Sequence, residues 1–169
     1  MHGSEEKEFL EKIDRHKGII YKVAKMYMDT AEDREDLVQE IMLRLWTSYR
    51  GFEGRSSFST WMYRVCINTA ITFLRKEKQK PAMVNDGWEV VEQRADELDN
   101  SKELKLELFY KAVKELNQIE KAILFYFMEG LPHKEISEHL GLSETNTRVK
   151  LNRTKEKLRQ IIKKYGYEF

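Results

Sequence analysis

The chain has 169 residues, and its 30 lysines and arginines nearly balance 29 aspartates and glutamates, for a formal net charge of +1. This length allows one ordinary domain or two small ones, and the single cysteine, Cys66, excludes a disulfide framework or a multi-cysteine metal site. No segment approaches the ~18 apolar residues of a membrane span, and the acidic, polar N-terminus is unlike a signal peptide, so we expect a cytoplasmic protein without membrane insertion.

Charge is distributed unevenly along the chain. Residues 44–80 carry 8 basic and 2 acidic side chains, and residues 145–164 carry 8 and 1, whereas residues 81–110 carry 3 and 8. Two basic segments separated by an acidic one suggest two surfaces for a polyanion. Solvated helix faces are the simpler interpretation of the same pattern.

Apolar residues recur at helical spacing along most of the chain, and no segment alternates with the period of a strand. We therefore predict an all-α fold, with helices over residues 5–28, 32–49, 57–78, 102–116, 118–130, 133–140 and 144–165. The stretch 79–101 is acidic and lacks helical periodicity. It predicts two small helical domains joined by an acidic flexible linker, although a linker of this kind could be a mere solvated tether.

The helix predicted over 32–49 has a broad apolar stripe that we expect to be buried. Its members are Leu37, Val38, Ile41, Met42, Leu45, Trp46 and Tyr49. Leu43 projects almost opposite to this stripe, among Asp36, Gln39 and Glu40. An apolar side chain within such a face suggests a protein partner, while a single exposed leucine is also unremarkable.

A serine-rich loop bracketed by glycines precedes the helix predicted over 57–78. On that helix Arg64 and Asn68 belong to a polar stripe, and Trp61 and Tyr63 lie next to it. Aromatic rings beside cations and amides suit single-stranded nucleic acid, because bases stack on the rings while cations follow the backbone. An aromatic pair at the start of a helix is more often part of a core, so both interpretations stay open.

The C-terminal domain contains a helix-turn-helix pattern. A helix with apolar positions ends at Gly141, Leu142 is apolar, and Ser143 can cap the following helix. The second helix of such a motif enters the major groove of DNA. An ordinary amphipathic surface helix would show a similar periodicity without the turn.

The second helix has distinct faces when its residues are placed at 100° intervals. The side expected to face the core holds Thr147, Leu151, Thr154, Leu158, Ile161, Ile162 and Tyr165. Arg148, Val149, Asn152 and Arg153 project away from it, with Lys155 at the boundary. Cations there can hold phosphates, and Asn152 or Arg153 can read base edges.

No catalytic constellation is recognisable in the sequence. A glycine-rich phosphate loop and an HExxH motif are both missing, and the four histidines do not have the spacing of metal ligands on one helix face. We therefore predict a protein that is not an enzyme and that has no catalytic residues, metal site or cofactor.

Four motifs occur in a recognisable order. They are DREDLVQEIMLRLW, then FEGRSSFSTWMYRVCINTAITFLRK, then the acidic linker, then EGLPHKEISEHLGLSETNTRVKLNRTKEKL. This order resembles the extracytoplasmic-function (ECF) sigma factors, the minimal bacterial sigma factors with only the second and fourth conserved domains. The resemblance covers residues 8–163 and implies sigma domain 2 over 1–80, a linker over 81–101 and sigma domain 4 over 102–169.

The resemblance also implies three binding surfaces. The expected contacts with core RNA polymerase are Asp36, Gln39, Glu40 and Leu43. The loop and helix that resemble the element melting the −10 region supply Glu53, Arg55, Ser56, Ser57, Trp61, Arg64 and Asn68. The last helix resembles the −35 reader, through Arg148, Val149, Asn152, Arg153 and Lys155. The linker resembles the acidic strand that threads the RNA path of the polymerase.

The partners implied by the resemblance are core RNA polymerase, promoter DNA as duplex and melted strand, and an anti-sigma factor. Two other classes of protein stay open. A helix-turn-helix regulator acting without core polymerase would leave residues 32–80 without a role. A helical protein–protein module would leave the charge segregation unexplained, and its behaviour toward DNA would not depend on salt.

Overall fold

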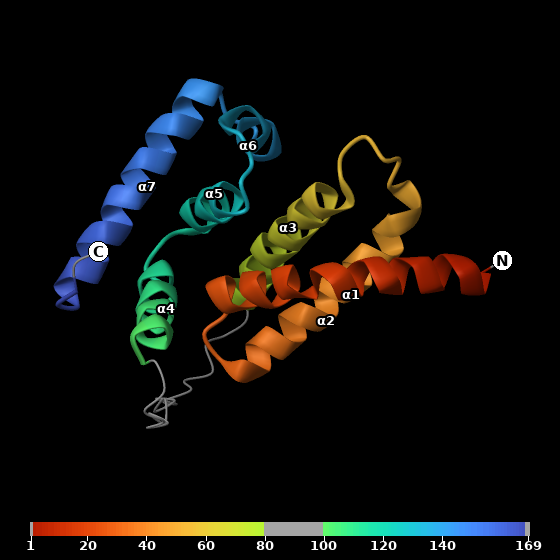
Figure 1. Ribbon diagram of the computed structural model, residues 1–169, viewed down its shortest axis with the longest axis horizontal. Helices are drawn as coiled ribbons and strands as arrows, with labels where there is room; N and C mark the ends of the chain where they lie inside the picture. Colours follow the sequence, from red (N-terminus) through yellow and green to blue (C-terminus); the bar gives the residue numbers. More distant parts are fainter. Residues whose placement is uncertain (1, 80–99, 168–169) are drawn as a thin grey trace. The chain divides into compact units, whose positions relative to one another are not determined.

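The computed structural model describes residues 2–79 and 100–167, which fold almost entirely into helices (Figure 1). In chain order the elements are α1 (His2–Tyr27), α2 (Ala31–Ser48), the 3₁₀ helix η1 (Tyr49–Gly51), α3 (Phe58–Gln79), α4 (Asn100–Val113), α5 (Gln118–Met128), α6 (His133–Leu140) and α7 (Glu144–Lys164). No strand occurs within these described ranges, and the all-helical prediction is confirmed. The predicted helix ends differ from the observed ones by at most three residues.

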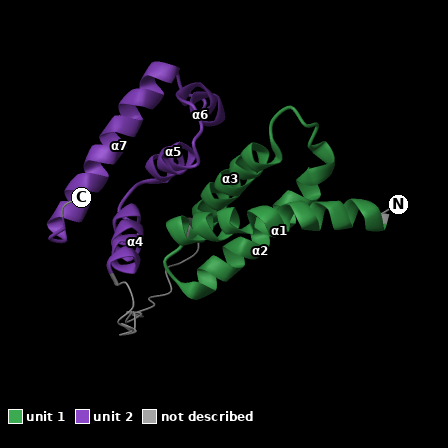
Figure 2. Ribbon diagram, in the orientation of Figure 1, with its two compact units in different colours: residues 1–80 green, residues 81–169 purple. Residues whose placement is uncertain are grey.

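The chain divides into two compact units, residues 1–80 and 81–169 (Figure 2). Most of the predicted acidic linker, residues 80–99, lies outside the described residues. Its last two positions, Asn100 and Ser101, belong to the first turn of α4 rather than to a linker.

In the N-terminal unit, α1, α2 and α3 pack against one another. The hydroxyl of Thr30 starts α2 by accepting a hydrogen bond from the backbone N–H of Asp33 at 3.1 Å. Leu37, Ile41 and Leu45 follow at intervals of four residues and are fully buried. Burying a side chain of this size stabilises the fold by about 1.5–3 kcal/mol.

The buried stripe of α2 is narrower than predicted. Trp46 is 40% exposed, and Val38, Met42 and Tyr49 are half-buried. Positions 38, 42 and 46 each follow a fully buried residue, so they are rotated by 100° toward the edge of the interface. Trp46 therefore lies at the rim of the core instead of inside it.

In the C-terminal unit, α7 packs against α4, α5 and α6. The fully buried side chains at the centre include Val113, Ile123, Phe125, Ile136 and Leu151. A capping box starts α5, because the Asn117 side chain and the Glu120 carboxylate each accept the other residue's backbone N–H.

The C-terminal end of α7 is held to α4. The hydroxyl of Tyr165 donates a hydrogen bond to the carboxylate of Glu115, and the Lys111 ammonium lies 4.6 Å from the centre of the Tyr165 ring. Burial and the nearby Glu115 carboxylate raise the pKa of Tyr165 to about 12, because both disfavour the phenolate.

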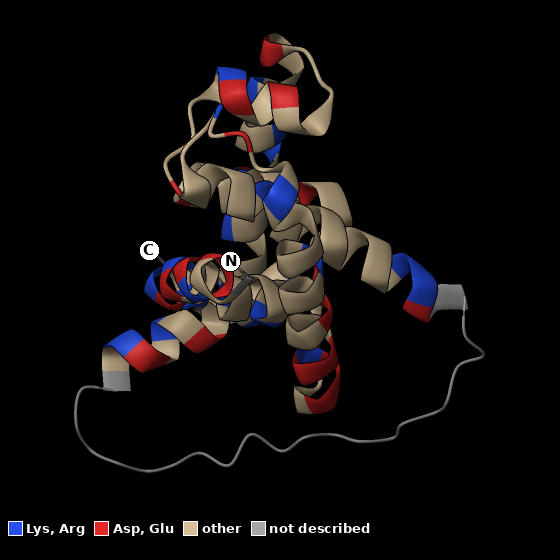
Figure 3. Cartoon of the chain, turned by 90° about the vertical axis from the view of Figure 1, so that its right-hand side faces the viewer, with Lys and Arg blue, Asp and Glu red and all other residues tan. Residues whose placement is uncertain are grey.

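Lysine and arginine, as well as aspartate and glutamate, occur on helices of both units (Figure 3). Within residues 2–79 and 100–167, no helix combines the length and the apolar character needed to cross a membrane.

Candidate nucleic-acid interface

The predicted helix-turn-helix is formed by α6, a three-residue turn and α7. Gly141 has a φ of 66°, and the backbone N–H groups of Gly141 and Leu142 both donate to the carbonyl of Ser137. Glycine is favoured at this position because it lacks the Cβ that makes positive φ costly. The hydroxyl of Ser143 then accepts the N–H of Asn146 at 3.1 Å and begins α7. The predicted turn is confirmed.

α7 has one buried and one exposed face, as the sequence predicts, although Leu158 and Tyr165, which were expected to face the core, are only half-buried. The most deeply buried positions, each at most 6% exposed, are Thr147, Leu151, Thr154, Ile161 and Ile162. The exposed candidates for DNA contact are Arg148, Val149, Asn152 and Arg153, while Lys155 is half-buried at the edge. Four of the five predicted −35 contacts are therefore exposed side chains of one helix.

The cations on this face differ in whether a neighbouring side chain already contacts them. Arg148 pairs with Glu144, one turn earlier, at 3.2 Å. The ammonium of Lys155 lies 3.7 Å from the centre of the Phe127 ring on α5, in a cation–π contact. The guanidinium of Arg153 has no ion pair or hydrogen bond with other residues that the structure describes. Arg153 is therefore readily available to a ligand.

Three buried hydroxyls lie in the helix-turn-helix core, at Ser137, Thr147 and Thr154. Ser137 donates to the carbonyl three residues earlier at 2.6 Å, and the two threonines donate to carbonyls four residues earlier at 2.9 and 2.8 Å. Because each hydroxyl is satisfied within its own helix, the polar groups do not carry the cost of an unsatisfied buried donor.

The loop before α3, residues 52–57, carries four of the predicted −10 contacts. Glu53 and Arg55 are exposed and pair with each other at 2.8 Å. Ser56 is exposed, and its hydroxyl donates to the carbonyl of Ser57 at 3.1 Å. The hydroxyl of Ser57 accepts the backbone N–H three residues later at 3.2 Å. Ser57 thus has a capping role at the start of α3 that the sequence analysis did not assign.

Trp61 belongs to an aromatic cluster that the sequence analysis missed. Its ring centre lies 5.2 Å from that of Phe52, 5.4 Å from that of Phe58 and 6.3 Å from that of Tyr49. These rings come from η1, the loop and α3, so no single helical period reveals them. Trp61 is half-buried, and Arg64 in the next turn is exposed. The ring therefore has a packed part and an accessible part.

A groove of about 470 Å³ lies between α2 and α3. Its lining includes Glu40 and Arg44 from α2 and Asn68, Thr72 and Lys76 from α3. The family resemblance implies that Glu40 belongs to a polymerase-binding face and Asn68 to a DNA-binding face. The structure places both residues on one groove, a proximity that only helix packing determines.

The outward face of α2 has the predicted exposure. Leu43 is 55% exposed, and Asp36 and Gln39 are exposed as well. Glu40 is half-buried and pairs with Arg44 at 3.2 Å. An apolar side chain in contact with water is therefore surrounded by acidic and amide groups.

In the part of the chain that the structure describes, no cluster of three or more His, Cys, Asp or Glu residues could hold a metal ion. Cys66 is fully buried on α3. Burial raises the pKa of its thiol to about 12, because the apolar surroundings disfavour the thiolate.

The fold and these surfaces define the class as a two-unit helical protein with a helix-turn-helix. Residues 13–80 match the family profile of sigma-70 region 2, and residues 106–158 match that of sigma-70 region 4. The chain belongs to the ECF sigma factors of RNA polymerase, with regions 2 and 4.

Individual relatives match to different extents. RNA polymerase sigma factor SigV of Bacillus subtilis is 28% identical over 148 residues, which cover 87% of this chain and 86% of SigV. ECF RNA polymerase sigma factor SigW of the same organism is 24% identical over 92% of this chain and 89% of SigW. The match to ECF RNA polymerase sigma factor SigG of Mycobacterium tuberculosis is 49% identical over 49 residues, but these are 29% of this chain and 13% of SigG.

Two solved structures share the fold. The sigma factor RpoE, in complex with the anti-sigma factor NepR from Bartonella quintana, superposes with a TM-score of 0.69 at 17% identity, over 93% of this chain and 98% of RpoE. CnrH, in complex with the cytosolic domain of CnrY, gives a TM-score of 0.65 at 17% identity, over 94% of this chain and 89% of CnrH.

Proposed function

We propose that this chain binds core RNA polymerase, recognises the −35 and −10 promoter elements and promotes strand opening, acting in the bacterial cytoplasm. Residues 1–80 would serve as sigma domain 2, residues 81–101 as the linker and residues 102–169 as sigma domain 4. The observation that carries the proposal is the exposed face of α7, the second helix of the helix-turn-helix, which lies opposite the buried face of the same helix.

The −35 element is read by α7 in the major groove. Arg153 makes no ion pair within the described residues, so its guanidinium is free to donate two hydrogen bonds to a guanine edge or to hold a phosphate. Asn152 is exposed beside it and has the donor and acceptor that an adenine edge requires. Val149, 40% exposed, offers an apolar contact for a thymine methyl group.

The −10 element is held by the loop before α3 and by α3 itself. The accessible part of the Trp61 ring stacks on an unpaired base, while Arg64 and Asn68 contact the backbone and base edges of the separated strand. Stacking on one aromatic ring stabilises a single strand by about 1–3 kcal/mol. Because only an unpaired base can stack in this way, the same contact favours the opened duplex.

Core polymerase binds the outward face of α2, formed by Asp36, Gln39, Glu40 and Leu43. The exposed Leu43 supplies an apolar contact, and the surrounding acidic groups select a partner surface with basic residues. An anti-sigma factor is a further partner. This part of the proposal is supported by the complex of the sigma factor RpoE with the anti-sigma factor NepR, because RpoE shares the fold of this chain.

The proposal is tested by reconstituting the chain with core polymerase and mapping transcription start sites across a genome. On a promoter found in this way, Arg153→Ala should weaken the closed complex by about 1–3 kcal/mol. Trp61→Ala should leave the closed complex nearly intact and slow strand opening. A template melted in advance across the start site should rescue Trp61→Ala but not Arg153→Ala.

Phe52→Ala is the matched control for Trp61→Ala. It disturbs the same aromatic cluster, because the two rings lie 5.2 Å apart, but it keeps the tryptophan. Opening slowed equally in both variants would mean that cluster packing, and not base stacking, is responsible. Tight and specific binding of promoter duplex without polymerase would instead favour an independent helix-turn-helix regulator.

A further inference from the structure

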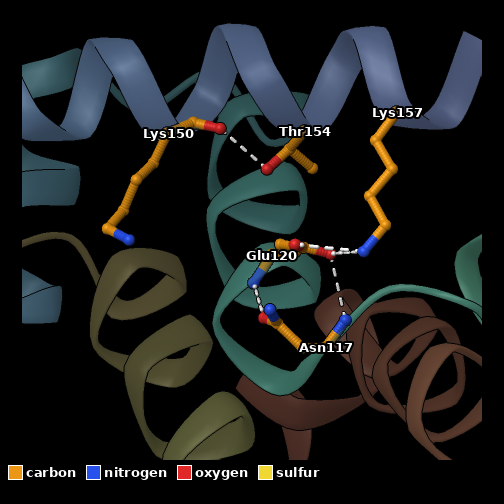
Figure 4. A network of polar contacts seen from close by, with 5 residues as sticks. All are labelled: Asn117, Glu120, Lys150, Thr154 and Lys157. Carbon is orange, nitrogen blue, oxygen red and sulfur yellow. Dashed lines mark hydrogen bonds and ion pairs between the residues drawn. The ribbon is translucent and has the colours of Figure 1, made fainter.

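Glu120 connects the start of α5 to the middle of α7 (Figure 4). Its carboxylate accepts hydrogen bonds from the Lys157 ammonium, at 3.2 Å to Oε1 and 3.0 Å to Oε2. The same carboxylate accepts the backbone N–H of Asn117 at 3.1 Å, and the Asn117 side chain accepts the N–H of Glu120 at 2.9 Å. The capping box therefore orients the carboxylate that receives Lys157.

This ion pair joins two helices, unlike the pairs that α7 makes within itself. Arg159 and Glu156, for example, are three residues apart on α7, so their pairing cannot position that helix against a neighbour. Lys157 and Glu120 are 37 residues apart, with side chains 46% and 23% exposed. A partly shielded and already oriented carboxylate loses less side-chain entropy on pairing than a fully exposed one.

The other contacts near the place where α7 meets α5 show why the Glu120–Lys157 ion pair matters. The buried hydroxyl of Thr154 donates to the carbonyl of Lys150 in its own helix and so does not tie α7 to α5 (Figure 4). Lys155 contacts the Phe127 ring on α5, and Lys157 contacts Glu120. Residues 155 and 157 are about 200° apart around the helix axis, so the two contacts restrain α7 against rolling in both directions.

We propose that Glu120 is a positioning residue for duplex recognition by α7, and that it also keeps Lys157 away from DNA phosphates. This inference rests on the proposed role of α7 as the −35 reader. A roll of about 20° would move atoms on the helix surface by about 2 Å. A displacement of this size would break a hydrogen bond between the side chain of Asn152 or Arg153 and a base edge. While Lys157 is paired with Glu120, it does not neutralise a DNA phosphate and therefore releases no counterion from the DNA.

The experiment uses the full-length chain in complex with core polymerase and two DNA probes. One probe is an upstream promoter duplex selected from a random library with the wild-type complex, and the other is a scrambled duplex of the same composition. Affinities measured over a series of salt concentrations yield two quantities. These are the specificity ratio between the probes and the slope of log affinity against log salt.

Glu120→Gln keeps an acceptor for the capping box but removes the charge that holds Lys157. We expect the specificity ratio to fall about fivefold. The salt slope on the scrambled duplex should steepen by about 0.9, because the released lysine contacts one phosphate. Lys157→Met should lower the specificity ratio similarly without a steeper slope, and the double variant should behave like Lys157→Met. Lys164→Met, the matched control, removes another exposed cation of α7 and should leave the ratio unchanged.

Two results would overturn the positioning role. One is an unchanged specificity ratio in both Glu120→Gln and Lys157→Met. The other is a slope that flattens by about 0.9 in Lys157→Met alone, which would show that this lysine already contacts phosphate. Arg153→Ala separates this failure from failure of the proposed function. If Arg153→Ala keeps the wild-type specificity ratio, α7 is not the reader. If Arg153→Ala lowers the specificity ratio and Glu120→Gln leaves it at the wild-type value, only the role of Glu120 is overturned.

Discussion

Leu43 and Leu45 lie two residues apart on α2 but in opposite environments, since Leu43 is 55% exposed and Leu45 is fully buried. Replacing Leu45 by alanine removes a packed side chain and leaves a cavity, which should lower the free energy of unfolding by about 2–5 kcal/mol. Leu43→Ala removes a largely hydrated side chain, and alanine has a slightly higher helix propensity. The free energy of unfolding should therefore change by less than about 0.5 kcal/mol.

Affinity for core polymerase should depend on Leu43 and not on Leu45. Truncating a central contact residue of an interface typically costs about 1–3 kcal/mol, so Leu43→Ala should weaken binding by about 5- to 150-fold. Combining it with Glu40→Lys should weaken binding further, because this change reverses a charge on the same face and breaks the 3.2 Å pair with Arg44. Leu45→Ala should keep near wild-type affinity in the fraction of molecules that is folded.

Two measurements separate these effects. Urea unfolding followed by circular dichroism reports the free energy of unfolding, and competition against a labelled wild-type chain reports the affinity for core polymerase. If Leu43→Ala were as unstable as Leu45→Ala, the exposure argument would be refuted. If Leu43→Ala bound core polymerase as tightly as wild type, the contact assignment would be refuted.

Three further predictions concern local features of the fold. Ser143→Ala removes the cap of α7 and should lower the free energy of unfolding by about 1 kcal/mol in urea, while Thr145→Ala, an exposed position in the first turn, should have a smaller effect. The pKa of Tyr165 is raised from 10.0 to about 12, so its protonated form contributes stability below pH about 10, and this contribution is lost as the pH rises through about 12. Tyr165→Phe should lack this part of the pH dependence in thermal melts, and identical curves would contradict the prediction. The Cys66 thiol, buried and with its pKa raised to about 12, should react with a thiol reagent only after unfolding in denaturant, so rapid labelling of the native chain would show that its burial is wrong.

The helices and the turn of the helix-turn-helix could be predicted from the sequence because their causes are local. Apolar residues repeat with the helical period, and capping groups lie within a few residues of the backbone that they satisfy. Gly141 and Ser143 therefore marked the turn before α7, and the periodicity of α7 separated its buried face from its exposed one. The same reasoning placed Leu43 on the outer face of α2.

The tertiary structure decided which residues from different elements meet. Periodicity gives the angle of a side chain around its helix but not the neighbour that it reaches, so Trp46 was expected inside the core and lies at its rim. The ring cluster around Trp61 depends on the path of the loop before α3. The availability of two cations on α7 depends likewise on α5, because the Glu120 carboxylate, 37 residues away, pairs with Lys157, and the Phe127 ring contacts Lys155. Arg153 has no such partner among the described residues.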